Sequence, residues 1–193
     1  FLAWTTTPWT LPGNVALAVN PNIEYIEVVQ EGNKYILSKD LAVKVFKFEG
    51  TDWVSGKKIY KGSDLVGKSY EPVFEYYSKD KTLKNKENGW KVYGAEFVTT
   101  DSGTGIVHIA PAFGADDYDL SVKNNLPFIQ HVTTSGVFKS EVTDFVGQQV
   151  KPKDTTEEKD AHQKADIEII KYLAKKEALF TKEKIIHSYP HCW

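Results

Sequence analysis

Hydrophobic and polar residues alternate along several stretches of the first half of the chain. Residues 14–29 alternate in this way and lead through Glu31-Gly32-Asn33 into Tyr35-Ile36-Leu37. Side chains of a strand point alternately to its two faces, and Gly and Asn favour tight turns, so this pattern predicts a β-hairpin. The alternation returns in residues 90–99 and again in residues 104–110, where further strands are expected.

Two stretches without clear alternation are rich in aromatic and other β-favouring residues. They cover residues 53–60 and 70–77, separated by Gly62 and Gly67, and they predict two more strands. The polar run at residues 79–88 is interpreted as a solvated connection rather than as a loop that contacts phosphates.

Three segments have helical patterns. Ser38 ahead of residues 40–43 favours a short capped helix. Residues 116–120 begin with acidic side chains, which suit the positive end of a helix dipole, and Asn124-Asn125 closes that second helix. Apolar residues at spacings of four over residues 157–178 predict an amphipathic third helix, whose apolar side we assign to the core.

Interleaved strands with few helices indicate an α+β, β-rich domain, with a mixed, barrel-like β core and peripheral helices. The length of 193 residues suits one well-packed domain, residues 1–193, and 41% hydrophobic with 26% charged residues is typical of a folded, soluble protein. The absence of Met and the abrupt ends suggest a domain excised from a larger protein, expected to be monomeric.

Charge and cysteine content narrow the classes of partner and compartment. A net charge of -2 argues against a chain that grips nucleic acid along its length, so any such contact should be local. The single cysteine, Cys192, excludes an internal disulfide and fits the reducing cytoplasm. No stretch approaches the roughly 18 apolar residues of a membrane span, so no membrane association is expected.

The densest candidate chemistry lies in residues 4–12, Trp-Thr-Thr-Thr-Pro-Trp-Thr-Leu-Pro. On a strand, Thr5 and Thr7 would share one face and Thr6 the other, while the following Pro8 favours an extended Thr7. Hydroxyls that both donate and accept suit ribose hydroxyls or an attacking water. The alternative is an ordinary β-favouring Thr run, which the flanking tryptophans and prolines make less attractive.

His108 and Asp117 form the second candidate pair. They flank residues 111–115, so a strand end, a turn and a helix start would aim both side chains into one cleft. Asp117 is the sharper candidate, because a carboxylate recognises an amino group through a charge-assisted bond; the alternative is a charge that only stabilises the start of a helix. A triad of both with Ser102 is disfavoured, because Ser102 lacks the glycine-flanked turn that presents a nucleophile.

His187, His191 and Cys192 are the only close set of soft metal ligands. Pro190 prevents a helix that would align them, and no fourth ligand is near in the sequence. We therefore predict no metal site.

Taken together, these motifs resemble the editing domain of isoleucyl-tRNA synthetases. The resemblance rests on residues 4–12 with Asn14, on Gly-Thr-Gly-Ile-Val-His at 103–108, on Gly-Ala-Asp-Asp-Tyr at 114–118, and on His-Ser-Tyr-Pro-His-Cys-Trp at 187–193. Valyl and leucyl relatives carry Thr-Thr-Arg-Pro where this chain has Thr-Thr-Thr-Pro. The sequence around Phe113 most resembles the cytosolic eukaryotic branch of this family.

The resemblance implies hydrolysis of valine from mischarged tRNA(Ile). It implies that His108 walls the side-chain pocket against isoleucine and that Asp117 holds the ammonium group. Thr5, Thr6 and Thr7, with Thr10 and Asn14, would hold the terminal ribose and position water, and Trp4 and Tyr189 would line the adenosine. No general base is evident.

The resemblance also defines the partners and what this chain lacks. Partners would be the 3′ end of valine-charged tRNA(Ile) and the catalytic domain of the parent synthetase. The ATP-binding signatures of that catalytic domain are absent here, so ATP and Mg²⁺ belong to the parent and no cofactor is expected in this domain. Two alternatives stay open: a non-catalytic module that docks the tRNA end through stacking aromatic residues, and a structural insertion.

Overall fold

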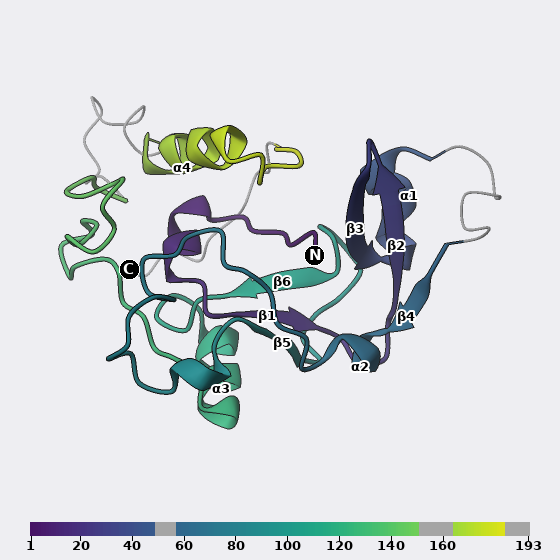
Figure 1. The fold of residues 1–193 in the computed structure, drawn as a ribbon, viewed down its shortest axis with the longest axis horizontal. Coiled ribbons are helices and arrows are strands. Elements are labelled where there is room, and N and C mark those ends of the chain that lie inside the picture. Colours follow the sequence, from purple (N-terminus) through teal and green to yellow (C-terminus); the bar gives the residue numbers. More distant parts are fainter. Residues whose placement is uncertain (49–56, 151–163, 184–193) are drawn as a thin grey trace, which may run out of the picture.

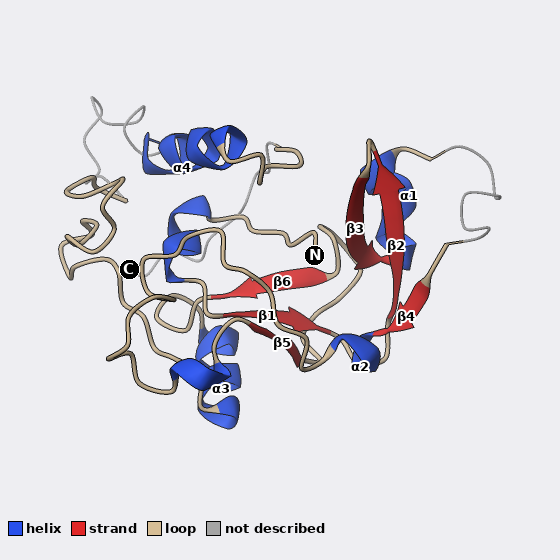
Figure 2. Ribbon diagram, viewed as in Figure 1, coloured by secondary structure: helices blue, strands red, loops and turns tan. Residues whose placement is uncertain are grey.

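The structure, a computed structural model, describes residues 1–48, 57–150 and 164–183. In this part of the chain six strands form two separate three-stranded sheets, and the helices lie around them (Figures 1 and 2). The α+β class with a few peripheral helices is confirmed. The barrel-like core takes the form of two open sheets, neither of which closes on itself within the described residues.

The first sheet has the order β5-β1-β6. Its central strand β1 (Ala16–Val19) runs parallel to β5 (Lys91–Gly94) and antiparallel to β6 (Ile106–Ile109). All four residues of β1 are buried, as expected for a strand covered on both faces. The register places Leu17 of this central strand opposite His108 of the edge strand β6.

The second sheet has the order β3-β2-β4 and is antiparallel throughout. It contains β2 (Glu24–Gln30), β3 (Asn33–Ser38) and the short β4 (Ile59–Lys61). The predicted hairpin is confirmed as β2–β3, and Glu31 and Gly32 both have positive φ, at 51° and 81°. Two consecutive positive φ values are the signature of the tight turn that matches strand twist.

The helices are short and lie at the margins of the sheets, and three of them were predicted. They are η1 (Pro8–Gly13), α1 (Lys39–Phe46), α2 (Gly62–Leu65), η3 (Lys86–Asn88), α3 (Ala115–Asn124) and α4 (Lys164–Lys175). α3 ends at Asn125 in a left-handed conformation, as the Asn pair predicted. α4 lies inside the predicted 157–178, of which 157–163 fall outside the described residues.

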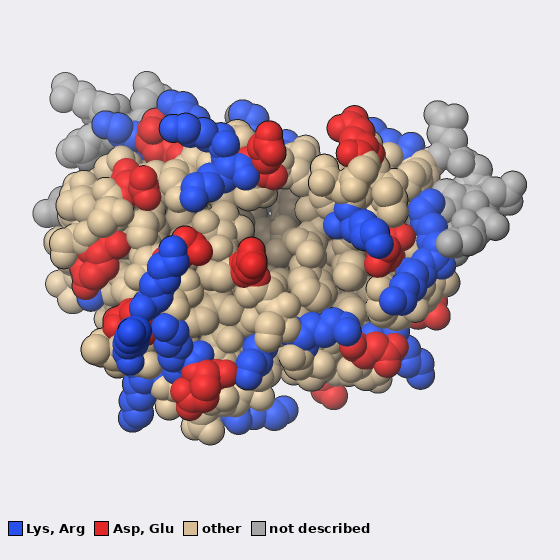
Figure 3. Space-filling model, viewed as in Figure 1, with Lys and Arg blue, Asp and Glu red and all other residues tan. Residues whose placement is uncertain are grey.

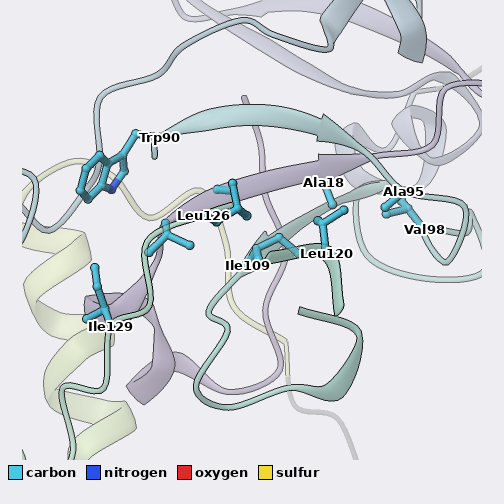
Figure 4. Close-up of a cluster of buried hydrophobic side chains, with 10 residues drawn as sticks. Ala18, Trp90, Ala95, Val98, Ile109, Leu120, Leu126 and Ile129 are labelled. Atoms are coloured by element: carbon cyan, nitrogen blue, oxygen red, sulfur yellow. The ribbon is translucent and has the colours of Figure 1, made fainter. Parts of the chain in front are cut away.

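Four clusters of buried apolar side chains hold the described elements together, and two of them enclose the N-terminal segment. One cluster joins the first sheet to α3, through Ala18 and Ile109 on one side and Leu120 on the other (Figure 4). A second cluster contains Ile169 of α4, Trp9 of η1 packs against this cluster, and α4 passes over η1 in Figure 1. The N-terminal segment is therefore enclosed between the first sheet and α4.

Two local predictions were wrong, at residues 70–77 and at Ser38, and the strand expected at 53–60 is confirmed only at its end. Residues 70–77 form no strand, because Phe74 packs its ring 5.0 Å from Tyr172 of α4 instead of joining a sheet. Of the strand expected at 53–60, residues 53–56 lie outside the described part, and β4 begins only at Ile59. Ser38 precedes α1 without capping it, because its side chain lies against Gly105, where an added Cβ would come within 2.5 Å.

The threonines do not sit on a strand. Trp4 makes a single β-bridge to Val107, and the chain then turns into η1, with Thr7 at φ -134° and ψ 78°. The expected sharing of one strand face by Thr5 and Thr7 is therefore wrong. Pro8, at the start of η1, ends any extended run.

Candidate active site

His108 lies on β6 opposite Leu17 and is almost fully buried, with 8% of its surface exposed. Burial, helped by repulsion from His131, lowers the pKa of His108 to about 4, because a charged ring would lose its hydration without gaining a counter-ion. At neutral pH His108 is therefore an uncharged imidazole with one N–H.

Thr10 determines which nitrogen of His108 carries that proton. The Thr10 hydroxyl oxygen lies 2.8 Å from the Thr7 carbonyl oxygen and 2.9 Å from His108 Nε2. A carbonyl only accepts, so the hydroxyl donates to Thr7 and accepts from an Nε2–H of His108. Nδ1 of His108 therefore keeps its lone pair.

Asn14 lies on the other side of the imidazole. Its Nδ2 donates to the Ala16 carbonyl at 2.9 Å and is 3.5 Å from His108 Nδ1. Its Oδ1 accepts a hydrogen bond from the Tyr70 hydroxyl, and burial raises the pKa of Tyr70, so that this phenol stays protonated. Asn14 is thus oriented by two partners, with its amide hydrogens toward β1 and His108.

The three consecutive threonines lie just before η1. The Thr5 hydroxyl accepts from the Thr7 backbone N–H at 3.1 Å, and the hydroxyls of Thr6 and Thr7 are 3.3 Å apart. Thr6 is exposed, whereas Thr5 and Thr7 are partly buried. The Thr7 carbonyl, through Thr10, connects this segment to His108.

Asp117 occupies the first turn of α3 and is half-buried. Its Oδ2 accepts the backbone N–H of Ala110 at 2.8 Å, and its carboxylate folds over Gly114, where an added Cβ would come within 3.0 Å of Cγ. Burial raises the pKa of Asp117, partly offset by the Ala110 N–H and assisted by the charge of Asp116. Ala110 follows the end of β6, so Asp117 is tied to the strand that carries His108.

Strand β6 thus organises most of the predicted residues. The Trp4 backbone N–H donates to Ile106 at the start of β6 at 3.0 Å, His108 lies within it, and Asp117 is bound just beyond its end. The Trp4 side chain lies over Gly103, where an added Cβ would come within 2.7 Å of its ring. Tyr189 lies outside the described residues.

A cavity of about 170 Å³ opens beside His108 and Asn14. Figure 3 shows the molecule hollowed near its centre, close to where Figure 1 places the N-terminus, whose residues Phe1 and Ala3 line the cavity. Apart from Tyr70 and Glu71 the remaining lining is apolar: Leu11, Leu17, Val73 and Phe74. Neither Asp117 nor the three threonines belong to its described lining.

The described residues contain neither a metal-binding cluster nor a membrane-spanning helix. No group of three or more His, Cys, Asp or Glu side chains in that part of the chain is placed to hold a metal ion. His187, His191 and Cys192 lie outside it. In the same residues no helix has both the length and the apolar character needed to cross a bilayer.

The chain is similar over its whole length to a segment of several known proteins. No family model matches the chain. It is 45% identical over its full length to isoleucine–tRNA ligase 2 of Bacillus anthracis, 44% to isoleucine–tRNA ligase of Clostridium kluyveri, and 40% to a probable cytoplasmic isoleucine–tRNA ligase of Dictyostelium discoideum. The whole chain is homologous to one segment of isoleucyl-tRNA synthetases.

This synthetase segment spans only 16% of the length of the Bacillus and Clostridium relatives and 17% of the Dictyostelium relative. The relatives include bacterial proteins as well as a eukaryotic cytoplasmic form. Among solved structures, the leucyl-tRNA synthetase editing domains of P. knowlesi and P. falciparum are similar over 64% and 65% of this chain. The matched regions make up 49% and 47% of those two chains, with 22% and 21% sequence identity and a TM-score of 0.45 in both cases.

Sequence reasoning on this synthetase segment missed two residues. Tyr70, which orients Asn14, lies in the aromatic stretch that was interpreted as a strand, and only its long-range contact reveals its role. His131 is fully buried and donates to the backbone of η1, although nothing in its sequence context marks it. Both contacts join residues that are far apart in the chain, which local patterns do not report.

Proposed function

We propose that this isoleucyl-tRNA synthetase segment is a proofreading hydrolase that removes valine from mischarged tRNA(Ile). The observation that carries the proposal is the neutral His108, fixed by Thr10 on one side and facing Asn14 on the other, beside a mainly apolar cavity. A buried uncharged ring at the edge of such a cavity suits contact with an aliphatic side chain.

The need for such an activity follows from the energetics of recognition. One methylene in an apolar pocket contributes only about 1–3 kcal/mol to discrimination, and isoleucyl-tRNA synthetase is the standard example of that limit. A synthetic site that must accept isoleucine therefore also accepts some valine. A second site that admits valine and excludes isoleucine corrects the error.

In the proposed reaction, water attacks the carbonyl carbon of the aminoacyl ester. The bond between that carbon and the ribose oxygen breaks, the ribose oxygen takes a proton, and free valine leaves. Asp117 holds the ammonium group, and His108 limits the length of the side chain. Thr5, Thr6, Thr7, Thr10 and Asn14 are proposed to hold the ribose and the water, with Trp4 and Tyr189 beside the adenosine.

We assign the rate to positioning rather than to a protein base. A pKa of about 4 makes His108 a weak base at neutral pH, and its Nε2 already donates to Thr10. Holding the reactants in the correct orientation can by itself lower the activation free energy by up to about 7–11 kcal/mol. The free hydroxyl of the substrate ribose completes the set of groups near the ester.

The wider context belongs to the same proposal. We propose one editing domain over residues 1–193, acting as a monomeric unit of a cytoplasmic synthetase. It would receive the tRNA 3′ end from the synthetic domain, which alone uses ATP and Mg²⁺.

The decisive experiment compares Asp117→Asn with Asp116→Asn, assayed by release of labelled valine from Val-tRNA(Ile) in the full-length synthetase. Asparagine retains an oxygen for the Ala110 N–H but removes the charge that would bind ammonium. Loss of one charge-assisted bond, about 1.5–3 kcal/mol, predicts a roughly 10- to 100-fold lower kcat/KM. Asp116 is exposed in the same helical turn and should change activity little. Equal activities in both variants would contradict the proposal.

A docking module without catalysis is the alternative from another class. Its stacking residues are already engaged, because Trp9 packs edge-on against Phe113 at 5.0 Å and Trp4 covers Gly103. Binding of Val-tRNA(Ile) without any turnover by the full-length enzyme would favour docking over hydrolysis. A purely structural insertion would show no turnover, and its aromatic residues would contribute nothing to binding of Val-tRNA(Ile) by the full-length enzyme.

A further inference from the structure

His131 is a second buried imidazole that the proposed reaction does not use. It lies in the connection after α3, has no exposed surface, and places Nε2 2.9 Å from the carbonyl oxygen of Trp9. Because a carbonyl only accepts, Nε2 carries the proton, and Nδ1 is left as a buried lone pair without a partner. Burial lowers the pKa of His131 to about 4, so the ring is neutral.

The ring occupies a closely fitted slot. Phe113 meets it edge-on at 4.8 Å and Phe138 stacks on it at 5.7 Å between ring centres. Gly13, at the end of η1, makes room for the imidazole, because a Cβ at this position would lie 2.4 Å from His131 Nδ1. A phenyl ring would fill this slot without leaving a nitrogen unpartnered. What the imidazole adds is the single N–H directed at Trp9.

With that N–H, both backbone polar groups of Trp9 are hydrogen-bonded to residues outside η1. The Trp9 backbone N–H donates to Asp166 Oδ1 of α4 at 2.8 Å, and its carbonyl accepts from His131. η1 needs such external bonds because Pro8 and Pro12 have no backbone N–H to contribute. The next residue is Thr10, whose hydroxyl oxygen accepts a hydrogen bond from His108 Nε2–H.

We propose that His131 is a positioning residue for the editing site: by binding Trp9 it holds η1 so that Thr10 fixes the tautomer of His108. Both histidines contact η1, His131 at the Trp9 carbonyl and His108 at the Thr10 hydroxyl. The catalytic consequence rests on the proposed function, whereas the structural relay from His131 to His108 does not.

The test reads the ring nitrogens of both histidines by ¹⁵N NMR in the 193-residue chain. Wild-type His108 and His131 should both appear as Nε2–H tautomers, and the His131 proton should show a hydrogen-bond coupling to the Trp9 carbonyl carbon. His131→Phe should leave His108 as a mixture of tautomers. His131→Gln, whose amide N–H can reach the same carbonyl, should restore the wild-type His108 signal.

Each other result overturns the proposal. A folded His131→Phe chain with an unchanged His108 signal would show that Thr10 needs no help from His131. If His131→Phe does not fold, the wild-type spectrum decides, because an Nδ1–H tautomer of His131, or no coupling to Trp9, excludes the relay.

The activity of the full-length enzyme separates this proposal from the proposed function. Val-tRNA(Ile) hydrolysis should show a kcat on the order of 10- to 100-fold lower for His131→Phe, with KM little changed and recovery in His131→Gln. A wild-type enzyme without hydrolysis would refute the function and leave the tautomer result standing. Hydrolysis unaffected by His131→Phe would refute the positioning role alone.

Discussion

Replacing Thr10 by Val tests the hydrogen-bonded centre of the site directly. Valine keeps the size and branching of threonine and removes only the hydroxyl. That hydroxyl donates to the Thr7 carbonyl at 2.8 Å and accepts from His108 Nε2 at 2.9 Å. Thr10 itself is 6% exposed, so water does not readily replace the lost partner.

The expected cost has two parts. Loss of the bond to the Thr7 carbonyl accounts for about 1 kcal/mol, and a buried His108 N–H without a partner accounts for about 1–3 kcal/mol more. The free energy of unfolding should therefore fall by about 2–4 kcal/mol. In a domain of this size each kcal/mol shifts Tm by roughly 2–4 °C, so Tm should fall by roughly 4–16 °C.

Thermal unfolding followed by circular dichroism, with urea unfolding at 25 °C, measures both quantities. Thr6→Val is the matched control, because Thr6 is exposed and its hydroxyl makes only a 3.3 Å contact with that of Thr7. The control should lie within about 0.5 kcal/mol of wild type. If Thr10→Val is as stable as Thr6→Val, Thr10 does not hold His108 and the assignment of the tautomer fails.

Three further predictions use other parts of the site. Gly13→Ala should lower the free energy of unfolding by about 1–3 kcal/mol, because the new Cβ would lie 2.4 Å from His131 Nδ1; wild-type stability in urea would show that the slot can relax. His108 and His131 have folded pKa values of about 4, below the roughly 6.5 of an unfolded chain, so their contribution is complete above pH 6.5 and declines as the pH falls. Urea titrations between pH 6.5 and 5 should show the free energy of unfolding falling by up to about 1.4 kcal/mol per pH unit for each histidine, with a smaller slope in His131→Phe; a flat profile contradicts this. His108→Ala should let the full-length enzyme deacylate Ile-tRNA(Ile) as well as Val-tRNA(Ile), and a folded variant that still spares isoleucine would remove His108 from the specificity role.

The elements that the sequence predicted correctly are those specified by near neighbours. The β2–β3 hairpin follows from alternation on either side of Glu31-Gly32, and α3 follows from its acidic start and from Asn125 at its end. In each case, residues a few positions apart determine the backbone conformation.

The strand predicted at residues 70–77 failed because aromatic residues favour any half-buried surface. Phe74 fills the core below α4, and the Tyr76 hydroxyl donates to Asp144 at 2.6 Å, so tertiary packing uses the residues that propensity assigned to a sheet. The prediction that Thr5 and Thr7 lie on a strand failed for a similar reason, because the β propensity of threonine does not report that η1 starts at Pro8.

In the candidate site, too, local motifs identified some residues, and residues whose role depends on long-range contacts were missed. Motifs led to His108, Thr10 and Asn14, which the fold joins by close contacts. Tyr70 and His131 escaped because their roles depend on contacts with Asn14 and Trp9, across long stretches of chain.

The pairing of β1 has a consequence for synthesis on the ribosome. Ala16 emerges early, yet its partners Lys91 and Ile109 are translated much later, and Trp9 must wait for Asp166. Long-range pairings of this kind close slowly, whereas the β2–β3 hairpin can form as soon as it is exposed. The segment with η1 and β1 is thus fixed later than the hairpin that follows it in the chain. A nascent chain stalled before Asp166 would hold a finished hairpin beside a half-assembled site.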